Sequence, residues 1–135
     1  MKGVLIDSCV LLDIMTEDPV WFAWSASQLE ECGEKFPLFI NPVIYSEVSI
    51  SYQKIEELEI ALSPVIFKRA AIPWEAAFLA GKVFLQYRKS GGQHILPLPD
   101  FFIGAHAVIE QLSLLTRDTK RFRHYYPQLK MISPA

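Results

Sequence analysis

The hydrophobic positions of this chain fall into short apolar runs that alternate with longer stretches of helical spacing. Four runs predict β-strands, at residues 3–6, 36–40, 113–117 and 129–132. The run at 65–72 is ambiguous between an extended segment and a loop. Short apolar runs that alternate with helices are typical of a parallel sheet buried on both faces.

Helices are predicted between these runs. Asp18 with Pro19, and Asn41 with Pro42, each join a capping side chain to a first-turn proline, so each pair begins a helix. Gly33 is the expected end of the first of these two helices. The predicted helices span residues 10–14, 19–32, 42–52, 54–62, 74–90, 101–111 and 119–125. This order predicts an α/β fold, a three-layer α/β/α sandwich around a mostly parallel sheet.

The composition fits one globular domain over residues 1–135, with 51% hydrophobic and 21% charged residues. No apolar stretch approaches the roughly 20 residues that span a bilayer, and the first residues lead directly into a predicted strand. We therefore expect a cytoplasmic protein without a membrane partner. Cys9 and Cys32 show no pairing pattern and are expected to be reduced thiols.

The formal net charge of −2 conceals an uneven distribution. Residues 1–81 carry 5 basic and 12 acidic side chains, whereas residues 82–135 carry 8 basic and 3 acidic ones. Basic residues gather around Asp118, where Arg117 and the segment 120–123 are candidates for contacts with phosphates. Solvated helix ends explain such charges equally well, so charge alone does not identify a nucleic-acid partner.

Four carboxylates follow the ends of the apolar runs, or lie one turn beyond them. They are Asp7, Glu47, Asp100 and Asp118. In parallel α/β sheets, ligands bind at the carboxyl ends of the strands, so these side chains are expected to converge. Each also has a structural explanation, since Asp7, Asp100 and Asp118 are suited to helix starts and Glu47 to an exposed helix position.

A cluster of these acids has a chemical consequence. Two carboxylates about 4 Å apart repel by about 4 kcal/mol at an effective dielectric constant near 20, so a cluster needs protons or a cation. Oxygen ligands favour Mg²⁺ or Mn²⁺. Zinc would need paired histidines, and His94, His106 and His124 lack that spacing. Thr116 lies on the same side of an extended chain as Asp118, where its hydroxyl can orient a carboxylate or a water.

The sequence resembles the PIN domain and, within it, the VapC ribonuclease toxins of bacterial toxin–antitoxin pairs. Four segments carry the resemblance, at residues 6–8, 46–48, 98–107 and 114–118. It covers essentially the whole chain and is strongest over residues 91–127. The family often has Asn two places after its first Asp, where this chain has Cys9.

The resemblance implies a Mg²⁺-dependent endoribonuclease that leaves a 5′-phosphate and a 3′-hydroxyl. It assigns Asp7, Glu47, Asp100 and Asp118 to catalysis and metal binding, and Thr116 to a catalytic hydroxyl position. The implied partners are an RNA substrate and a cognate antitoxin, in a homodimer or in a heterotetramer or larger assembly. The aromatic segment at Trp21, Phe22 and Trp24 is explained either by core packing or by an antitoxin groove and a homodimer face.

Two other functions compete with this interpretation. A phosphatase or receiver-like Mg²⁺ domain needs an acceptor Asp after a mid-chain strand, and the stretch 65–73 has none. A catalytically weak PIN-like scaffold that binds RNA or protein would be favoured by loss of one of the four acids, all of which are present.

Overall fold

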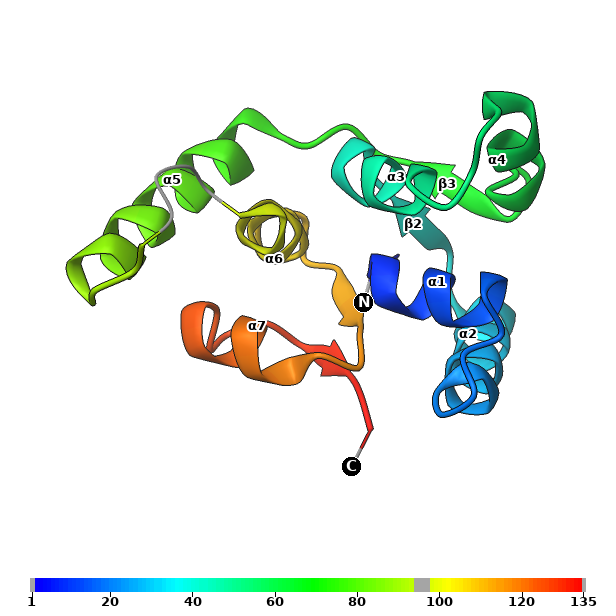
Figure 1. Cartoon of the computed structure of the whole chain (residues 1–135). Coiled ribbons are helices and arrows are strands. Elements are labelled where there is room, and N and C mark those ends of the chain that lie inside the picture. The colour runs from blue at the N-terminus through cyan, green and yellow to red at the C-terminus, as the bar shows by residue number, and fades with distance from the viewer. Residues whose placement is uncertain (1, 94–97, 135) are drawn as a thin grey trace.

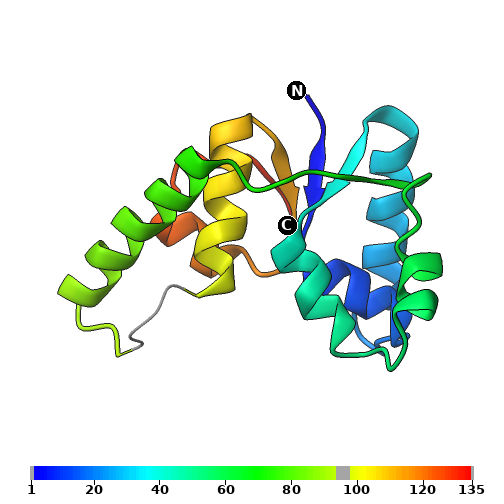
Figure 2. The same cartoon turned by 90° about the horizontal axis from the view of Figure 1, so that it is seen from above.

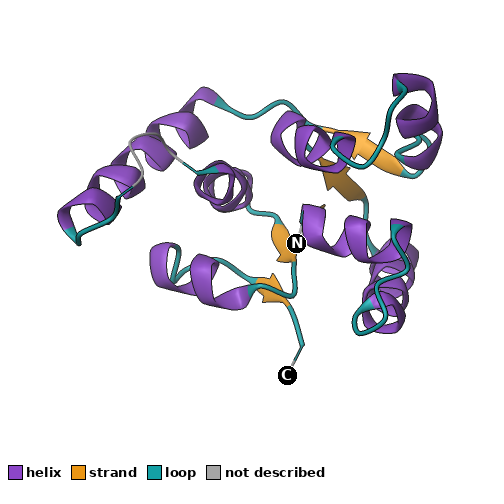
Figure 3. Cartoon of the chain, viewed as in Figure 1, coloured by secondary structure: helices purple, strands orange, loops and turns teal. Residues whose placement is uncertain are grey.

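The computed structural model describes residues 2–93 and 98–134 and has a sheet of five strands with seven helices around it (Figures 1 and 3). The strands are β1 (Val4–Ile6), β2 (Leu38–Ile40), β3 (Phe67–Arg69), β4 (Ser113–Leu115) and β5 (Met131–Ile132). The helices are α1 (Ser8–Met15), α2 (Phe22–Lys35), α3 (Pro42–Ser49), α4 (Ile55–Ala61), α5 (Trp74–Lys89), α6 (Pro99–Glu110) and α7 (Thr119–Tyr125).

The sheet has the strand order β3-β2-β1-β4-β5, and each of its four pairings is parallel. The predicted α/β/α sandwich is therefore confirmed, and its sheet is parallel throughout. The ambiguous run at 65–72 contains strand β3. Strands β1 and β4 are fully buried, as expected for central strands covered on both faces.

Helices cover both faces of this sheet. Figure 2 shows α5, α6 and α7 on one side, and α1 and α2 on the other. Helix α3 contacts both α1 and α6, so it lies near the line where the two layers meet. The strand order changes direction between β1 and β4, because the chain adds β2 and β3 on one side of β1 and then β4 and β5 on the other. The polar residues that follow β1 and β4 therefore lie at the point where ligands bind in sheets of this type.

Helix α2 differs at both ends from the prediction. Asp18 does accept hydrogen bonds from the backbone of Val20 and Trp21, but it caps a preceding turn, and the helix begins at Phe22. Gly33 lies inside the helix. Pro37 explains the actual end, since the residue before a proline is pushed out of the helical region, and Phe36 is extended.

The other elements agree more closely with their predicted ranges. Helix α3 begins at Pro42 as expected, with Asn41 Oδ1 accepting from the Ile44 N–H, and ends three residues early at Ser49. Helix α6 begins at Pro99, and the left-handed residue Gln111 follows its end. The predicted loop at 93–99 lies mostly outside the described residues.

A buried histidine joins the two layers. His106 of α6 is fully buried, and its Nδ1 lies 2.9 Å from Asn41 Nδ2. Because Asn41 uses its oxygen as the helix cap, its amide must donate, so His106 Nδ1 is the acceptor and the ring proton is on Nε2. Burial lowers the pKa of His106 and keeps it neutral. His106 is thus a structural residue. Among the described residues, no helix has both the length and the apolar character needed to cross a lipid bilayer.

Candidate active site

The register of β1 and β4 brings Asp7 next to Thr116. Ile6 pairs with Leu115, so the first residues after both strands are neighbours, and the Asp7 N–H donates to the Leu115 carbonyl. The Thr116 hydroxyl donates to Asp7 Oδ2 at 2.7 Å and accepts from the Asp118 N–H at 3.0 Å. Asp7 and Thr116 are both buried. The predicted hydroxyl therefore orients one carboxylate and fixes the backbone of a second.

Ser8 connects the first acid to Glu47. The Ser8 N–H donates to Asp7 Oδ1, and its hydroxyl donates to Glu47 Oε1, both at 2.8 Å. Glu47 comes from α3 and is half-buried. The structure thus places Glu47 beside Asp7 and not on an exposed helix face. Ser8 was not among the predicted site residues, although its place directly after Asp7 is the signal that could have identified it.

Asp100 and Asp118 are connected by a basic side chain. Arg121 Nη1 donates to Asp100 Oδ2 at 2.6 Å, and Arg121 Nε lies 3.7 Å from Asp118 Oδ2. Asp100 is in the first turn of α6, and Asp118 occupies the N-cap position of α7 without a capping hydrogen bond from its side chain. Arg121 was predicted only as a candidate for phosphate contacts. Its spacing of three residues from Asp118 is the helical signal for a pair.

Electrostatics show that three of the four acids influence one another. Burial raises the pKa of Asp7, the hydrogen bond from Thr116 lowers it, and the charge of Asp100 raises it further. Burial also raises the pKa of Glu47, with added repulsion from Asp7 and Asp100. Asp118 is not a leading cause of either shift, and its side chain is 44% exposed, so it lies at the margin of the cluster. The first three carboxylates therefore form an unfavourable cluster of negative charge that a cation would stabilise.

The chemistry of these donors fits a hard divalent cation, because all of them are oxygens. Within residues 2–93 and 98–134, however, no three His, Cys, Asp or Glu side chains are grouped closely enough to hold an ion together. Arg121 instead supplies positive charge to Asp100 and Asp118.

Cys9, at the position where the resemblance led us to expect an Asn, contacts the site. Its Sγ lies 3.4 Å from Asp7 Oδ2 and 3.7 Å from Thr116 Oγ1. Burial and the charge of Asp7 raise the pKa of the Cys9 thiol to about 12. The thiol is therefore protonated near neutral pH and acts as a weak donor to Asp7. The side-chain hydrogen bond at this position is therefore present, with a thiol as the donor.

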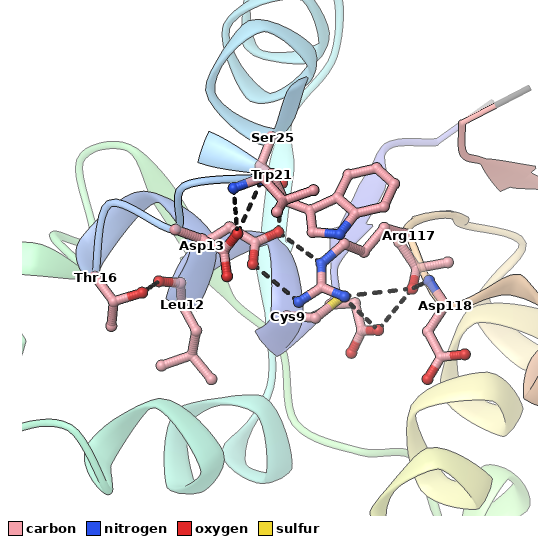
Figure 4. A network of polar contacts seen from close by, with 12 residues as sticks. Cys9, Leu12, Asp13, Thr16, Trp21, Ser25, Arg117 and Asp118 are labelled. Atoms are coloured by element: carbon pink, nitrogen blue, oxygen red, sulfur yellow. Dashed lines mark hydrogen bonds and ion pairs between the residues drawn. The ribbon is translucent and has the colours of Figure 1, made fainter. Parts of the chain in front are cut away.

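Arg117 has a structural role, which corrects its prediction as a phosphate contact. Its Nε and Nη2 donate to the two carboxylate oxygens of Asp13 at 2.8 and 3.0 Å (Figure 4). Asp13 is buried and also accepts from the Ser25 hydroxyl, while the guanidinium stacks on the Trp21 ring. A charge engaged in this way is not free for RNA. Asp13 was missed, although an acid within the apolar predicted helix at 10–14 signals a buried partner.

The aromatic segment is more tightly packed than an open groove would require. Trp21 is held between Arg117 and the edge of Trp24, and Trp24 packs against the core. Phe22 is 38% exposed and Val20 is 75% exposed, so these two residues carry the accessible apolar surface. Core packing therefore explains Trp24, and Trp21 packs against Arg117 and Trp24.

A comparison with models of protein families shows which family the chain belongs to. The model of the PIN domain matches residues 4–126, which is most of the chain. The chain belongs to the PIN domain family. All four carboxylates and Thr116 lie within the matched PIN region. Among curated proteins, none matches this sequence.

Solved structures share this PIN fold over nearly the full length. The chain is similar to one in VapBC2 of Rickettsia felis bound to promoter DNA, with 17% identity, 98% of each chain covered and a TM-score of 0.74. It is also similar to VapBC-1 of nontypeable Haemophilus influenzae (20% identity, 96% of each chain, TM-score 0.70). A toxin–antitoxin complex of Klebsiella pneumoniae gives 23% identity, 98% of each chain and a TM-score of 0.70. At these identities the likeness establishes the fold.

Proposed function

We propose that this PIN domain protein is a Mg²⁺-dependent endoribonuclease, with Mn²⁺ as an alternative ion, and that it is the toxin of a toxin–antitoxin pair. The observation that carries the proposal is the burial of Asp7 within hydrogen-bond networks that reach Glu47 and Thr116, next to the charge of Asp100. A buried, mutually repelling set of carboxylates costs stability, and such costs are typical of functional sites.

The roles of the side chains follow from their contacts. Asp7, Glu47, Asp100 and Asp118 would hold the cation, and Thr116 would orient Asp7 and the Asp118 backbone. A bound divalent cation polarises a phosphodiester and lowers the pKa of a coordinated water. Ser8 fixes the distance between Asp7 and Glu47, and the Cys9 thiol donates weakly to Asp7. These contacts orient Asp7 and Glu47 before any ligand arrives, whereas Asp100 and Asp118, which pair with Arg121, would have to move toward them to hold an ion.

The toxin assignment is supported by the PIN family and by the shared fold with chains from toxin–antitoxin complexes. We propose a cognate antitoxin as partner, in a heteromeric complex, and a cytoplasmic location. Antitoxin contact is assigned to the accessible part of the aromatic segment, at Val20 and Phe22. RNA contact is assigned to the exposed basic residue Lys120 of α7, because Arg117 is engaged with Asp13 and Arg123 is explained as a solvated helix end.

The function is tested by incubating the pure protein with total cellular RNA and Mg²⁺, and then mapping the new 5′ ends. We expect discrete cleavage sites that carry 5′-phosphates and that disappear when EDTA is added. Equal cleavage with and without EDTA would contradict the metal mechanism, and intact RNA in Mg²⁺ would favour the alternative of a catalytically weak scaffold.

A further inference from the structure

Arg121 forms both of the ion pairs that are seen to the four carboxylates within residues 2–93 and 98–134. Its guanidinium lies between two acids from different helices, Asp100 of α6 and Asp118 at the start of α7. The positive charge of Arg121 also lowers the pKa of Glu47. The charge of Asp7 in turn helps to raise the pKa of Arg121, so a cation supplied by the chain itself interacts with all four site acids.

The contact with Asp100 differs from an ordinary surface ion pair. Exposed pairs contribute little because both side chains are solvated and mobile. Here the Asp100 side chain is only 19% exposed, and the distance of 2.6 Å is that of a short, charge-assisted hydrogen bond. The Arg121 side chain is 63% exposed, so it can leave the acids and enter solvent without disturbing the core.

Close packing of α6 against α7 fixes this geometry. The Tyr126 ring lies so near Gly104 that a Cβ at Gly104 would collide with Tyr126 Cδ2. The Tyr126 hydroxyl also donates to the Phe101 carbonyl at 2.6 Å. Phe101, which is next to Asp100, is thereby held against Tyr126 at the end of α7. This packing keeps α7 close to the start of α6, so that Arg121 can reach Asp100.

We propose that Arg121 is a resident counter-ion that competes with the divalent cation for Asp100 and Asp118. This inference rests on the proposed metal-dependent function and adds a control of cation affinity to it. The oxygen that accepts the Arg121 hydrogen bond is also a candidate ligand atom, and a guanidinium at that distance repels a divalent ion at the same site. Cation binding must therefore displace Arg121, and this displacement weakens the affinity.

The competition is tested by titrating Mn²⁺ into the pure protein and following the free ion by electron paramagnetic resonance, without any RNA. The variant Arg121→Gln removes the competitor. Arg123→Gln is the matched control, because it removes the same charge two residues along α7 from an exposed side chain that makes no ion pair with the described residues. Circular dichroism in EDTA checks that each variant is folded.

We expect Arg121→Gln to bind Mn²⁺ more tightly than the wild type, by on the order of tenfold, as for other couplings between binding events. The control Arg123→Gln should stay close to the wild type. Wild-type binding with no gain in Arg121→Gln, or an equal gain in both variants, overturns the competition alone. If the wild type and both variants fail to bind Mn²⁺, the proposed metal-dependent function fails together with this inference.

Discussion

The Thr116 hydroxyl donates a hydrogen bond of 2.7 Å to Asp7 Oδ2, although 109 residues separate the two in the sequence. The pairing of Ile6 with Leu115 in the sheet creates this contact, because both side chains belong to the first residue after a central strand. The same hydroxyl accepts the Asp118 N–H, so one buried oxygen organises two of the proposed ligands.

Replacement of Thr116 by Val should show what the Thr116 hydroxyl contributes, because Val has nearly the same side-chain volume but cannot form its hydrogen bonds. Thr116→Val removes the acceptor of the Asp118 N–H and the strongest donor to Asp7 Oδ2, which should lower the free energy of unfolding by about 1–3 kcal/mol. Loss of an orienting partner should also reduce RNA cleavage roughly 10- to 100-fold. Urea unfolding and cleavage rates provide the measurements. Thr116→Ser retains the hydroxyl and serves as control, and a Val variant as active as the Ser variant would contradict the role.

Arg117 should affect stability more than RNA binding. In Arg117→Met the buried Asp13 keeps only the Ser25 hydroxyl as a side-chain donor, so an uncompensated charge remains. We expect a loss of about 3 kcal/mol in the free energy of unfolding, the lower end for broken buried pairs because Arg117 is partly exposed. The exposed control Arg123→Met should change stability little. Equal stability of the two variants in urea would show that the Asp13 pair is not structural.

Strand and helix order was predictable because it depends on local patterns. The proline signal at Pro42 and the buried runs of β1 and β4 depend on the local sequence alone. The end of α2 was not predicted, because Pro37 overrides the weaker tendency of Gly33.

The positions of the four acids followed from the strand ends, whereas their connections did not. Ser8, Asp13 and Arg121 act through contacts between elements, and these depend on how the layers pack. Arg117 and Arg121 show why the sequence alone was not enough. Tertiary packing places Arg117 on Asp13 and Arg121 on Asp100, and no local pattern distinguishes the two.

Two helical glycines should respond to alanine with opposite signs. A Cβ at Gly104 would collide with the Tyr126 ring, so Gly104→Ala should lower the free energy of unfolding by about 1–3 kcal/mol. Gly81 lies in α5, and a Cβ there would meet nothing within 4 Å. Gly81→Ala should therefore raise the free energy of unfolding by about 0.5–1 kcal/mol through helix propensity. Thermal or urea unfolding of both variants measures the signs. A stabilised Gly104→Ala variant would show that α6 and α7 are not locked as described.

The toxin assignment predicts an effect in cells. Expression of the wild-type chain alone should arrest growth, and expression of Asp7→Asn should not, because only the proposed site differs. Immunoblots of the soluble fraction confirm that both proteins accumulate. Normal growth with soluble wild-type protein would contradict the toxin role while leaving a nuclease activity open.

Replacement of Phe22 should weaken antitoxin binding more than it weakens RNA cleavage. Phe22→Ala removes accessible apolar surface on α2, whereas Trp24 packs against the core and its loss would disturb the fold. Co-purification with the co-expressed antitoxin should weaken in Phe22→Ala while RNA cleavage by the free protein is retained. Unchanged co-purification would place the antitoxin elsewhere on the surface.

The most direct test of the proposed site is the cleavage rate of Asp7→Asn on a mapped RNA in Mg²⁺, measured together with its melting temperature in EDTA. Burial opposes the charge of Asp7, whereas an amide NH2 in place of one oxygen loses a hydrogen bond from Ser8 or Thr116, so these two effects offset each other and the melting temperature should stay close to that of the wild type. Cleavage should nevertheless fall by at least about 100-fold, as expected when an interaction essential to the transition state is lost. A folded Asp7→Asn variant that cleaves RNA at the wild-type rate would contradict the account.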